Sequence, residues 1–358
     1  MKYIDEFRNS DLVNALVKAI QCRSKKKIRI MEVCGGHTLA IRKYGIQHLL
    51  PLNIELLSGP GCPVCVTDRT AIDKAIAIAK LPGIILATYG DLIRVPGSLS
   101  SLDQEKALGA DIRIIYSTLD ALEIARANPD KKVVFPGIGF ETTTPSSAVA
   151  ILEAQSRQIR NFYVLSLHKL MPPAMAALIE QGVQIDGYIG PGHVTAIAGA
   201  EMYQPLVERF GISVVVSGFE PVDLLQSVLM LTDMTENNRN GIEIQYKRAV
   251  SFTGNLKARE LVNKVFETCD DTWRGLGKIE GSGLSVRPEY RSFDASLQFD
   301  IQLSPAEEPP GCLCGEVLRG MKKPLDCKLF SRVCTPANPI GACMVSGEGA
   351  CQAYYNYR

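Results

Sequence analysis

Short apolar runs alternate with longer stretches of helical periodicity from residue 28 to about residue 216. Eight of the runs have the length of strands: residues 28–33, 54–57, 83–87, 112–115, 132–135, 162–165, 187–189 and 212–216. Helix-like segments, such as residues 71–80 and 174–181, lie between them. Strands that alternate with helices at this spacing form parallel sheets covered by helices on both faces. The pattern therefore predicts an α/β fold.

The alternation of strands and helices also repeats along the chain. Residues 28–33 run into the glycine-rich segment 34–38, residues 132–135 run into segment 137–144, and three more strands follow each. This predicts two similar α/β domains with parallel sheets, residues 28–117 and 118–240, which face each other across a cleft. After residue 240 the alternation stops. Residues 241–358 are expected to form a third, C-terminal domain, with an N-terminal helix at residues 1–27 packed against it.

The composition describes an ordinary globular protein of 358 residues, with 46% hydrophobic and 22% charged residues. A net charge of +1 gives no electrostatic reason to expect binding to nucleic acid or to a membrane surface. No apolar run approaches the roughly 18 residues of a membrane span, and the first residues lack the pattern of a secretory signal. We therefore expect a cytoplasmic protein whose cysteines are reduced.

Cysteines crowd into the end of the chain, where glycine and proline replace any hydrophobic period. Six of the eleven lie there: Cys312, Cys314, Cys327, Cys334, Cys343 and Cys351. The segment has too little apolar material to order itself, which predicts a metal bound by thiolates. Structural zinc usually shows paired C-x2-C units, and the only such pair, Cys62 and Cys65, lies far upstream. Wide, unequal spacings favour an iron-sulfur cluster. Zinc and reduced structural cysteines remain alternatives.

Two cysteine motifs follow predicted strands, where backbone N–H groups and helix dipoles favour anions. Cys34 stands just before a predicted helix, which should lower its pKa and make it a nucleophile or metal ligand. The two glycines after it let a ligand approach the backbone, and His37 supplies a second candidate ligand. Cys62 and Cys65, in a loop stiffened by prolines, are a candidate redox dithiol or half of a metal site.

Two further strand-end motifs carry Glu141 and His193. Glu141 is either an acid of the cleft or a helix-capping carboxylate. The chain has only four histidines, and the placement of His37 and His193 in glycine-rich strand-end loops indicates an active cleft. Core or surface roles are expected for His48 and His168. Walker, dinucleotide-binding, zinc-protease and nucleophile-elbow motifs are absent from the sequence, which disfavours those enzyme classes.

Five segments together resemble a known family. They are residues 34–38 (CGGHT), 59–65 (GPGCPVC), 139–143 (GFETT), 191–194 (PGHV) and the tail from Cys334 through residues 341–346 (GACMVS) to residues 349–351 (GAC). This set closely resembles the HypD family of hydrogenase maturation proteins, and the likeness covers essentially the whole chain.

The resemblance implies a scaffold on which the Fe(CN)2CO group of nickel-iron hydrogenase is assembled, with HypC as partner and cyanide delivered by HypE. It implies that Cys34 is the iron-binding thiolate, with His37 beside it as a ligand or proton partner. Cys62 and Cys65 would be a redox dithiol, and the C-terminal cysteines would hold a 4Fe-4S cluster that feeds it electrons. Glu141 and His193 would donate protons or position a partner.

Two other functions compete with this interpretation. The first is an iron-sulfur thiol-disulfide reductase that acts on a protein disulfide, which leaves Cys34 and His37 unexplained. The second is a zinc-stabilised interaction scaffold with no redox role. An anaerobic visible spectrum separates the second from the others, because iron-sulfur centres are coloured and zinc sites are not.

Overall fold

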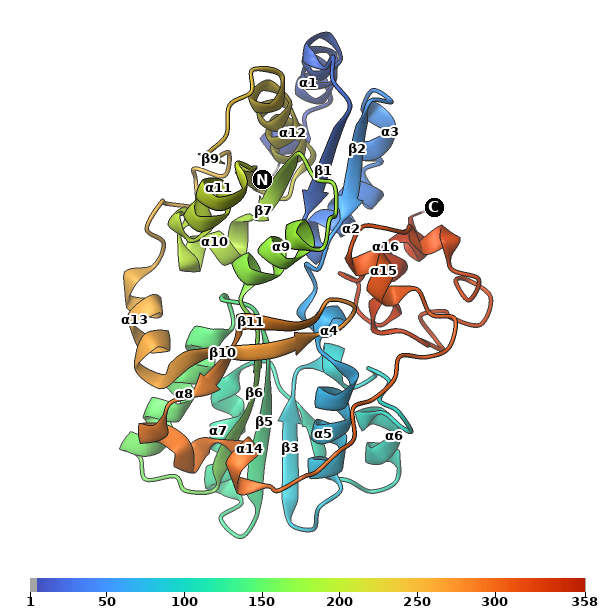
Figure 1. Ribbon diagram of the computed structural model, residues 1–358. Helices are drawn as coiled ribbons and strands as arrows, with labels where there is room; N and C mark the ends of the chain where they lie inside the picture. The colour runs from blue at the N-terminus through green and yellow to red at the C-terminus, as the bar shows by residue number, and fades with distance from the viewer. Residues whose placement is uncertain (1–4, 358) are drawn as a thin grey trace.

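Residues 5–357 are described by a computed structural model, which contains two parallel sheets and one antiparallel hairpin (Figure 1). The first sheet has the order β2-β1-β7-β8-β9, with strands Ile54–Ser58, Ile28–Glu32, Gly187–Pro191, Ser213–Ser217 and Ile242–Ile244. The second has the order β4-β3-β5-β6, with strands Ile112–Ile114, Ile84–Thr88, Lys132–Gly139 and Phe162–His168. Every pairing in both sheets is parallel. The predicted α/β class is confirmed.

The two sheets are not made from consecutive halves of the chain. After β1 and β2 the chain builds the whole second sheet, and only then returns to complete the first with β7, β8 and β9. The predicted domains at residues 28–117 and 118–240 are therefore wrong in their boundaries. The reason is physical: β1 is buried almost throughout and takes β7 as its second neighbour, with Ile30 beside Gly187. Apolar content marks a strand as central, but it does not identify the partner.

The N-terminal helix packs on the first sheet's unit. Helix α1 (Ser10–Arg23) lies along α12 (Pro221–Glu236), where Ile20 is fully buried in the same apolar cluster as Leu224 and Val228. An ion pair between Arg23 and Asp233 joins the two helices. The expectation that residues 1–27 pack against the C-terminal domain is thus wrong where the structure describes them, because the apolar face of α1 fits α12. Residues 1–4 of that range lie outside the described residues.

Helices cover both sheets. The first unit also contains α2 (Gly35–Lys43), α3 (Ile46–Leu49), α10 (Gly192–Ala198), η3 (Ala200–Tyr203), α11 (Gln204–Phe210) and η1 (Asp5–Arg8). The second contains α4 (Pro63–Val66), α5 (Arg69–Ala79), η2 (Gly90–Leu92), α6 (Leu102–Ala107), α7 (Thr118–Ala127), α8 (Thr144–Ser156) and α13 (Leu256–Val265). Helix α9 (Met171–Glu180) packs on the first unit, where it contacts α11 and its Met175 carbonyl accepts a hydrogen bond from the Tyr188 hydroxyl of β7. A hairpin of β10 (Phe266–Trp273) and β11 (Gly277–Val286) packs against β6 and α9, followed by η4 (Pro288–Phe293) and α14 (Ala295–Gln298).

The C-terminal segment has little regular structure and lies beside the junction of the two units (Figure 1, red). Its elements are short: α15 (Cys314–Leu318), η5 (Pro324–Asp326), η6 (Ala342–Met344) and α16 (Ala350–Asn356). Helix α16 contacts α2, and η6 contacts α4. The tail therefore touches both helices that follow the predicted cysteine motifs. Between residues 5 and 357, no helix combines the length and the apolar character needed to cross a membrane.

Candidate functional site

Cys34 lies at the carboxyl end of β1, at the N-cap of α2. The loop after the neighbouring strand β2 packs directly on it: Gly35 donates its N–H to the carbonyl of Gly61 at 3.0 Å. A Cβ atom on Gly61 would lie 2.1 Å from the Cys34 nitrogen, so only glycine permits this approach. Parallel pairing of β1 with β2 thus brings the first two predicted motifs together.

His193 is the histidine that faces Cys34. It is the second residue of α10, which follows β7, the other neighbour of β1, and its Nδ1 atom lies 3.9 Å from the Cys34 Sγ atom. Burial lowers the pKa of His193, which favours the neutral imidazole. The structure therefore joins the first and fourth predicted motifs in one site.

The pKa of Cys34 is raised, contrary to the prediction from its place at a helix start. Burial of the thiol is the largest cause, and the charge of Glu348 adds to it, whereas the backbone N–H groups of His37 and Gly36 act in the opposite direction. The helix effect is present but weaker than desolvation. A thiol in this position becomes a thiolate when a cation takes the place of its proton.

The two glycines after Cys34 have different uses. A Cβ on Gly35 would lie 2.4 Å from atoms of Glu348, so this glycine admits the C-terminal segment. A Cβ on Gly36 would instead meet the Phe219 ring at 3.4 Å and the Cys34 sulfur at 3.6 Å. Only Gly36 leaves space beside the thiol. The prediction that both glycines do so therefore holds for one of them.

His37 is fully buried and held in one orientation. Its Nε2 lies 3.0 Å from the Gly218 carbonyl oxygen, which can only accept a hydrogen bond, so the proton sits on Nε2. The Nδ1 atom then carries a free lone pair, and it has no hydrogen-bond partner among residues 5–357. Burial, assisted by His193, lowers the pKa of His37 to about 3, and the ring stacks on Phe219 at 4.7 Å. This imidazole is neutral, and its Nδ1 lone pair is free to accept a hydrogen bond or to bind a metal.

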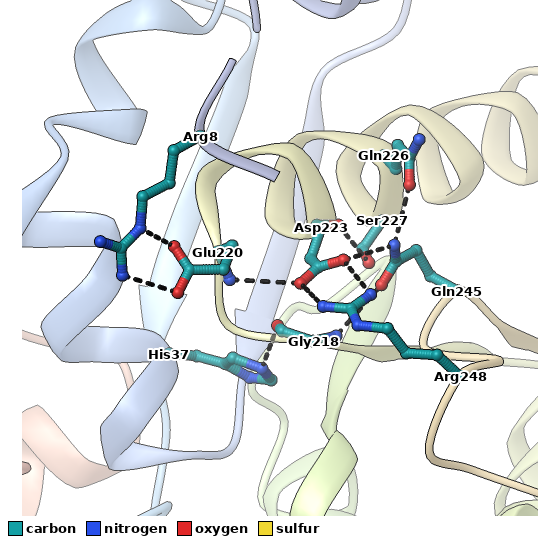
Figure 2. A network of polar contacts seen from close by, with 9 residues as sticks. All are labelled: Arg8, His37, Gly218, Glu220, Asp223, Gln226, Ser227, Gln245 and Arg248. Carbon is teal, nitrogen blue, oxygen red and sulfur yellow. Dashed lines mark hydrogen bonds and ion pairs between the residues drawn. The ribbon is translucent and has the colours of Figure 1, made fainter. Parts of the chain in front are cut away.

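A buried polar network fixes the turn that holds His37 (Figure 2). Gly218 donates its N–H to Oε1 of Gln245 at 3.1 Å, and Gln245 donates to Asp223 at 2.8 Å. Asp223 is fully buried and receives two hydrogen bonds from Arg248, at 2.8 and 2.6 Å. Charge-assisted pairs of this kind are rigid. Figure 2 shows the network running from Arg248 to the imidazole of His37.

Glu32, which the sequence analysis passed over, is a buried carboxyl group of the site. Its two oxygens accept hydrogen bonds from the Cys34 N–H at 3.0 Å and from the Thr38 hydroxyl at 2.5 Å. Burial raises the pKa of Glu32 to about 8, although both hydrogen bonds act to lower it. The signal was one acidic residue at the end of an apolar strand, two positions before the cysteine.

Cys62 and Cys65 are buried at α4 and lie together. Cys62 is the N-cap, and the Cys65 N–H points to its sulfur at 3.3 Å. Burial raises the pKa of the Cys65 thiol. Cys65 also makes a hydrogen-bonding contact with the thiol of Cys343 and approaches the Ala342 carbonyl oxygen at 3.9 Å. The structure thus places the predicted dithiol against the cysteine-rich tail.

The six tail cysteines form a connected set. The sulfur atoms of Cys314 and Cys343 are 2.7 Å apart, Cys343 also contacts Cys351, and Cys312 contacts Cys314. Cys334 shares a small apolar cluster with Cys327 and Cys351. Its sulfur lies 3.4 Å from the N–H of Ile340. Within residues 5–357 no three or more histidine, cysteine or acidic side chains converge as a ready metal site. The donors are nevertheless all thiols, and backbone N–H groups lie near those of Cys312 and Cys334, which matches what iron-sulfur clusters use.

Glu141 belongs to the same region but does not touch Cys34. Its Oε1 accepts the Met171 N–H at 2.9 Å, while the buried Oε2 has no partner among the described residues. Burial raises the pKa of Glu141 to about 7. It lines a pocket of about 280 Å³ between α8, α9, α10 and α13. The fully buried Tyr203 interacts electrostatically with both Glu141 and Cys34.

The remaining two histidines have the bland roles that the sequence predicts. His48 is exposed, and His168 is a core residue whose Nε2 lies 2.9 Å from the Ser147 hydroxyl.

Comparison with known proteins gives one consistent result. The HypD family model, described as "Hydrogenase formation hypA family", matches residues 11–358. Hydrogenase maturation factor HypD2 of Bradyrhizobium diazoefficiens is 50% identical over all of this chain and 97% of its own length. The HypD proteins of Azotobacter vinelandii and Escherichia coli K12 are 46% and 44% identical, again over the whole chain and 97% and 98% of their own lengths.

Proposed function

Because this chain belongs to the HypD family of hydrogenase maturation factors, we propose that it is the scaffold on which the Fe(CN)2CO group of nickel-iron hydrogenase is assembled, together with HypC and HypE. The iron is the substrate. The observation that carries the proposal is the contact between the buried Cys34 thiol and His193, with Gly36 beside the sulfur and with the buried His37 nearby in the same helix, its Nδ1 lone pair free. Such soft and borderline donors suit low-spin iron carrying cyanide and CO.

Cys34 would anchor the iron. The thiol releases a proton when it forms the sulfur-iron bond, and Nδ1 of His193, 3.9 Å away, is placed to receive it. The lowered pKa of His193 means that it passes the proton on instead of keeping it. The N–H groups of Gly36 and His37 face the sulfur and stabilise the thiolate once the metal is bound.

His37 would be the second group at the iron. A histidine ligand typically donates its other ring N–H to a carboxylate or backbone carbonyl, which fixes its tautomer and orientation. The Gly218 carbonyl does this at Nε2, and Nδ1 is left as the donor atom. Glu32, which accepts hydrogen bonds from the Cys34 N–H and the Thr38 hydroxyl, stiffens the first turn of α2, which carries both ligands.

Electrons would reach the site through thiols. A 4Fe-4S cluster bound by four of the six tail cysteines would supply electrons one at a time. Reduction of a Cys62–Cys65 disulfide consumes two electrons and two protons and gives two thiols. Cys343 is the tail cysteine in contact with Cys65, so electrons leaving the tail would pass through it. The cytoplasm, where low-potential donors are available, is the compartment that this chemistry needs.

A thiol-disulfide reductase is the second candidate, and the contact between Cys65 and Cys343 favours it. That function leaves Cys34, His37 and His193 without a role. Infrared spectroscopy of the protein purified anaerobically with HypC decides between the two. Bands of metal-bound cyanide and CO are expected if the protein is the scaffold. Their absence from the purified complex with HypC would favour the reductase.

A further inference from the structure

Arg274 is a buried cation between the dithiol and the cysteine-rich tail. It lies in the turn of the β10–β11 hairpin, and only 3% of its surface is exposed. Its backbone N–H donates to the Val66 carbonyl at 2.8 Å, and its Nε donates to the Thr67 carbonyl at 3.2 Å. These are the residues that follow Cys65, so Arg274 is tied to the end of α4.

The same turn is pressed against the tail. A Cβ on Gly275 would lie 2.4 Å from the Gly315 Cα atom, so the hairpin turn touches the residue after Cys314. The Arg274 charge acts electrostatically on both Cys314 and Cys343. The guanidinium is therefore close to the point where the tail thiols meet Cys65.

One side of the Arg274 guanidinium has a counter-charge and the other has none. Nη1 makes two hydrogen bonds to the carboxylate of Glu308, at 2.9 and 2.7 Å. The Glu308 side chain is 37% exposed, whereas that of Arg274 is 2% exposed, so the negative end of the pair faces outward. Nη2 is buried and has no partner among the described residues. A buried donor without an acceptor is unfavourable unless a ligand completes it.

Resting on the proposed function, we propose that Arg274 sets the reduction potential of the tail's iron-sulfur cluster, with Nη2 donating a hydrogen bond to a sulfur atom of the cluster or its cysteines. Reduction adds one negative charge to this centre. A buried cation and a hydrogen bond to sulfur both stabilise that charge and raise the potential. Arg274 is thus a positioning residue, which also holds the end of α4 next to the tail.

The test uses two substitutions in the full-length protein, with the cluster potential followed by electron paramagnetic resonance during redox titration. Arg274→Gln removes the cation and is expected to lower the potential. Glu308→Gln removes the counter-charge and is expected to raise it. Each shift should be on the order of tenfold in the equilibrium constant for one-electron reduction, about 59 mV. Opposite signs exclude simple loosening of the fold, which would move both variants the same way.

Two more variants complete the design. Arg274→Lys keeps the charge and loses Nη2, so its potential should fall between those of the unchanged protein and Arg274→Gln. Arg113→Gln removes an arginine from a comparable two-bond pair with Asp111 in the second sheet and should leave the potential unchanged. If Arg274→Gln fails to fold, Arg274→Lys carries the test, because Glu308 also acts directly on the Cys312 thiol.

The role of Arg274 and the presence of the cluster are tested by different outcomes. A full cluster whose potential is the same in Glu308→Gln and Arg274→Gln as in the unchanged protein would overturn the role of Arg274 and leave the proposed function standing. A protein that never binds iron and sulfide under anaerobic reconstitution would overturn the cluster, and this inference with it.

Discussion

The Sγ atom of Cys34 lies 3.9 Å from Nδ1 of His193, although 159 residues separate them in the chain. They meet because β1 and β7 are adjacent parallel strands whose carboxyl ends share one edge of the sheet. The whole second sheet is inserted between them. The contact between Cys34 and His193 therefore depends on the order of the strands in the first sheet, and so does any chemistry that uses both residues.

Cys34→Ser is expected to abolish the infrared bands of metal-bound cyanide and CO in the purified complex with HypC, while fold and tail cluster persist. A hydroxyl is a poor ligand for low-spin iron compared with a thiolate. His37→Ala should weaken the bands less, because the anchor remains. The exposed His48→Ala is the matched control and should have no effect. Bands of normal intensity in Cys34→Ser would place the iron elsewhere.

Cys334→Ala is expected to remove the iron-sulfur absorption and loosen the C-terminal segment, since metal binding supplies much of the order of such a segment. The same is expected of Cys327→Ala. Visible absorption and limited proteolysis under anaerobic conditions measure the two effects. Cys22, an exposed cysteine of α1, provides the control, and Cys22→Ala should retain the full spectrum. A full-strength spectrum from Cys334→Ala would refute the assignment.

Mild oxidation is expected to link Cys62 to Cys65, with a potential in the range of redox-active pairs, about −120 to −270 mV. A smaller amount of a Cys65–Cys343 link should appear, because those thiols are in contact. Thiol trapping followed by mass spectrometry detects both. Cys343→Ser should lose only the second link, and Cys269→Ser neither. If Cys62 and Cys65 are always modified independently, they are not an electron relay.

Gln245→Leu is expected to disturb the tautomer of His37. The substitution leaves the Gly218 N–H unpaired, at a cost of about 1–3 kcal/mol, and releases the turn whose carbonyl fixes the Nε2 proton. Nitrogen NMR of protein labelled at its four histidines reads the tautomer directly. The control is Gln226→Leu, which removes only a contact at the edge of the network. An unchanged His37 signal in Gln245→Leu would show that the network does not position the ring.

Glu141→Gln is expected to stabilise the protein at high pH and not at low pH. Burial raises the folded-state pKa of this carboxyl from 4.5 to about 7, so the folded state binds the extra proton between these values. The unchanged protein therefore loses stability as pH rises from 4.5 to about 7, by up to about 3 kcal/mol, and the loss persists above. The Glu141→Gln variant does not lose stability in this way, because its amide does not titrate.

Thermal unfolding at pH 4.5 and pH 8 measures this difference between the Glu141→Gln variant and the unchanged protein. Glu260→Gln, on the exposed side of α13, is the control and should follow the unchanged protein at both values. Equal unfolding temperatures for Glu141→Gln and the unchanged protein at pH 8 would contradict the raised pKa.

Strands and strand-end motifs could be predicted from the sequence, because a buried parallel strand is a continuous apolar run and ligand-binding loops follow it. All eight predicted strands exist, and the motifs at Cys34, Cys62 and His193 lie where such loops occur. Sheet membership could not be predicted in this way. Strands β2 and β3 are consecutive in the chain but lie in different sheets, and their composition does not show which sheet each one joins.

The residues that were missed are charged groups whose meaning depends on burial. Nothing in the sequence around Glu32 and Arg274 distinguishes them from surface residues. Their importance comes from burial, which removes water from around their charges. The same effect explains the wrong direction predicted for the pKa of Cys34, since a helix start is visible in the sequence and desolvation is not. Local sequence patterns reveal local interactions, whereas the roles of Glu32 and Arg274 and the pKa of Cys34 are set by the residues packed around them in the fold.

The excursion of the chain between β2 and β7 has a consequence for synthesis on the ribosome. Strands β3 to β6 are contiguous, so the second sheet can form as soon as His168 has emerged, while β1 and β2 wait for partners not yet translated. Until β7 is made, β1 lacks the strand that pairs with its second edge. Cys34 gains His193 only after β7 is made, so a nascent chain that ends before this histidine lacks the contact between the thiol and the imidazole.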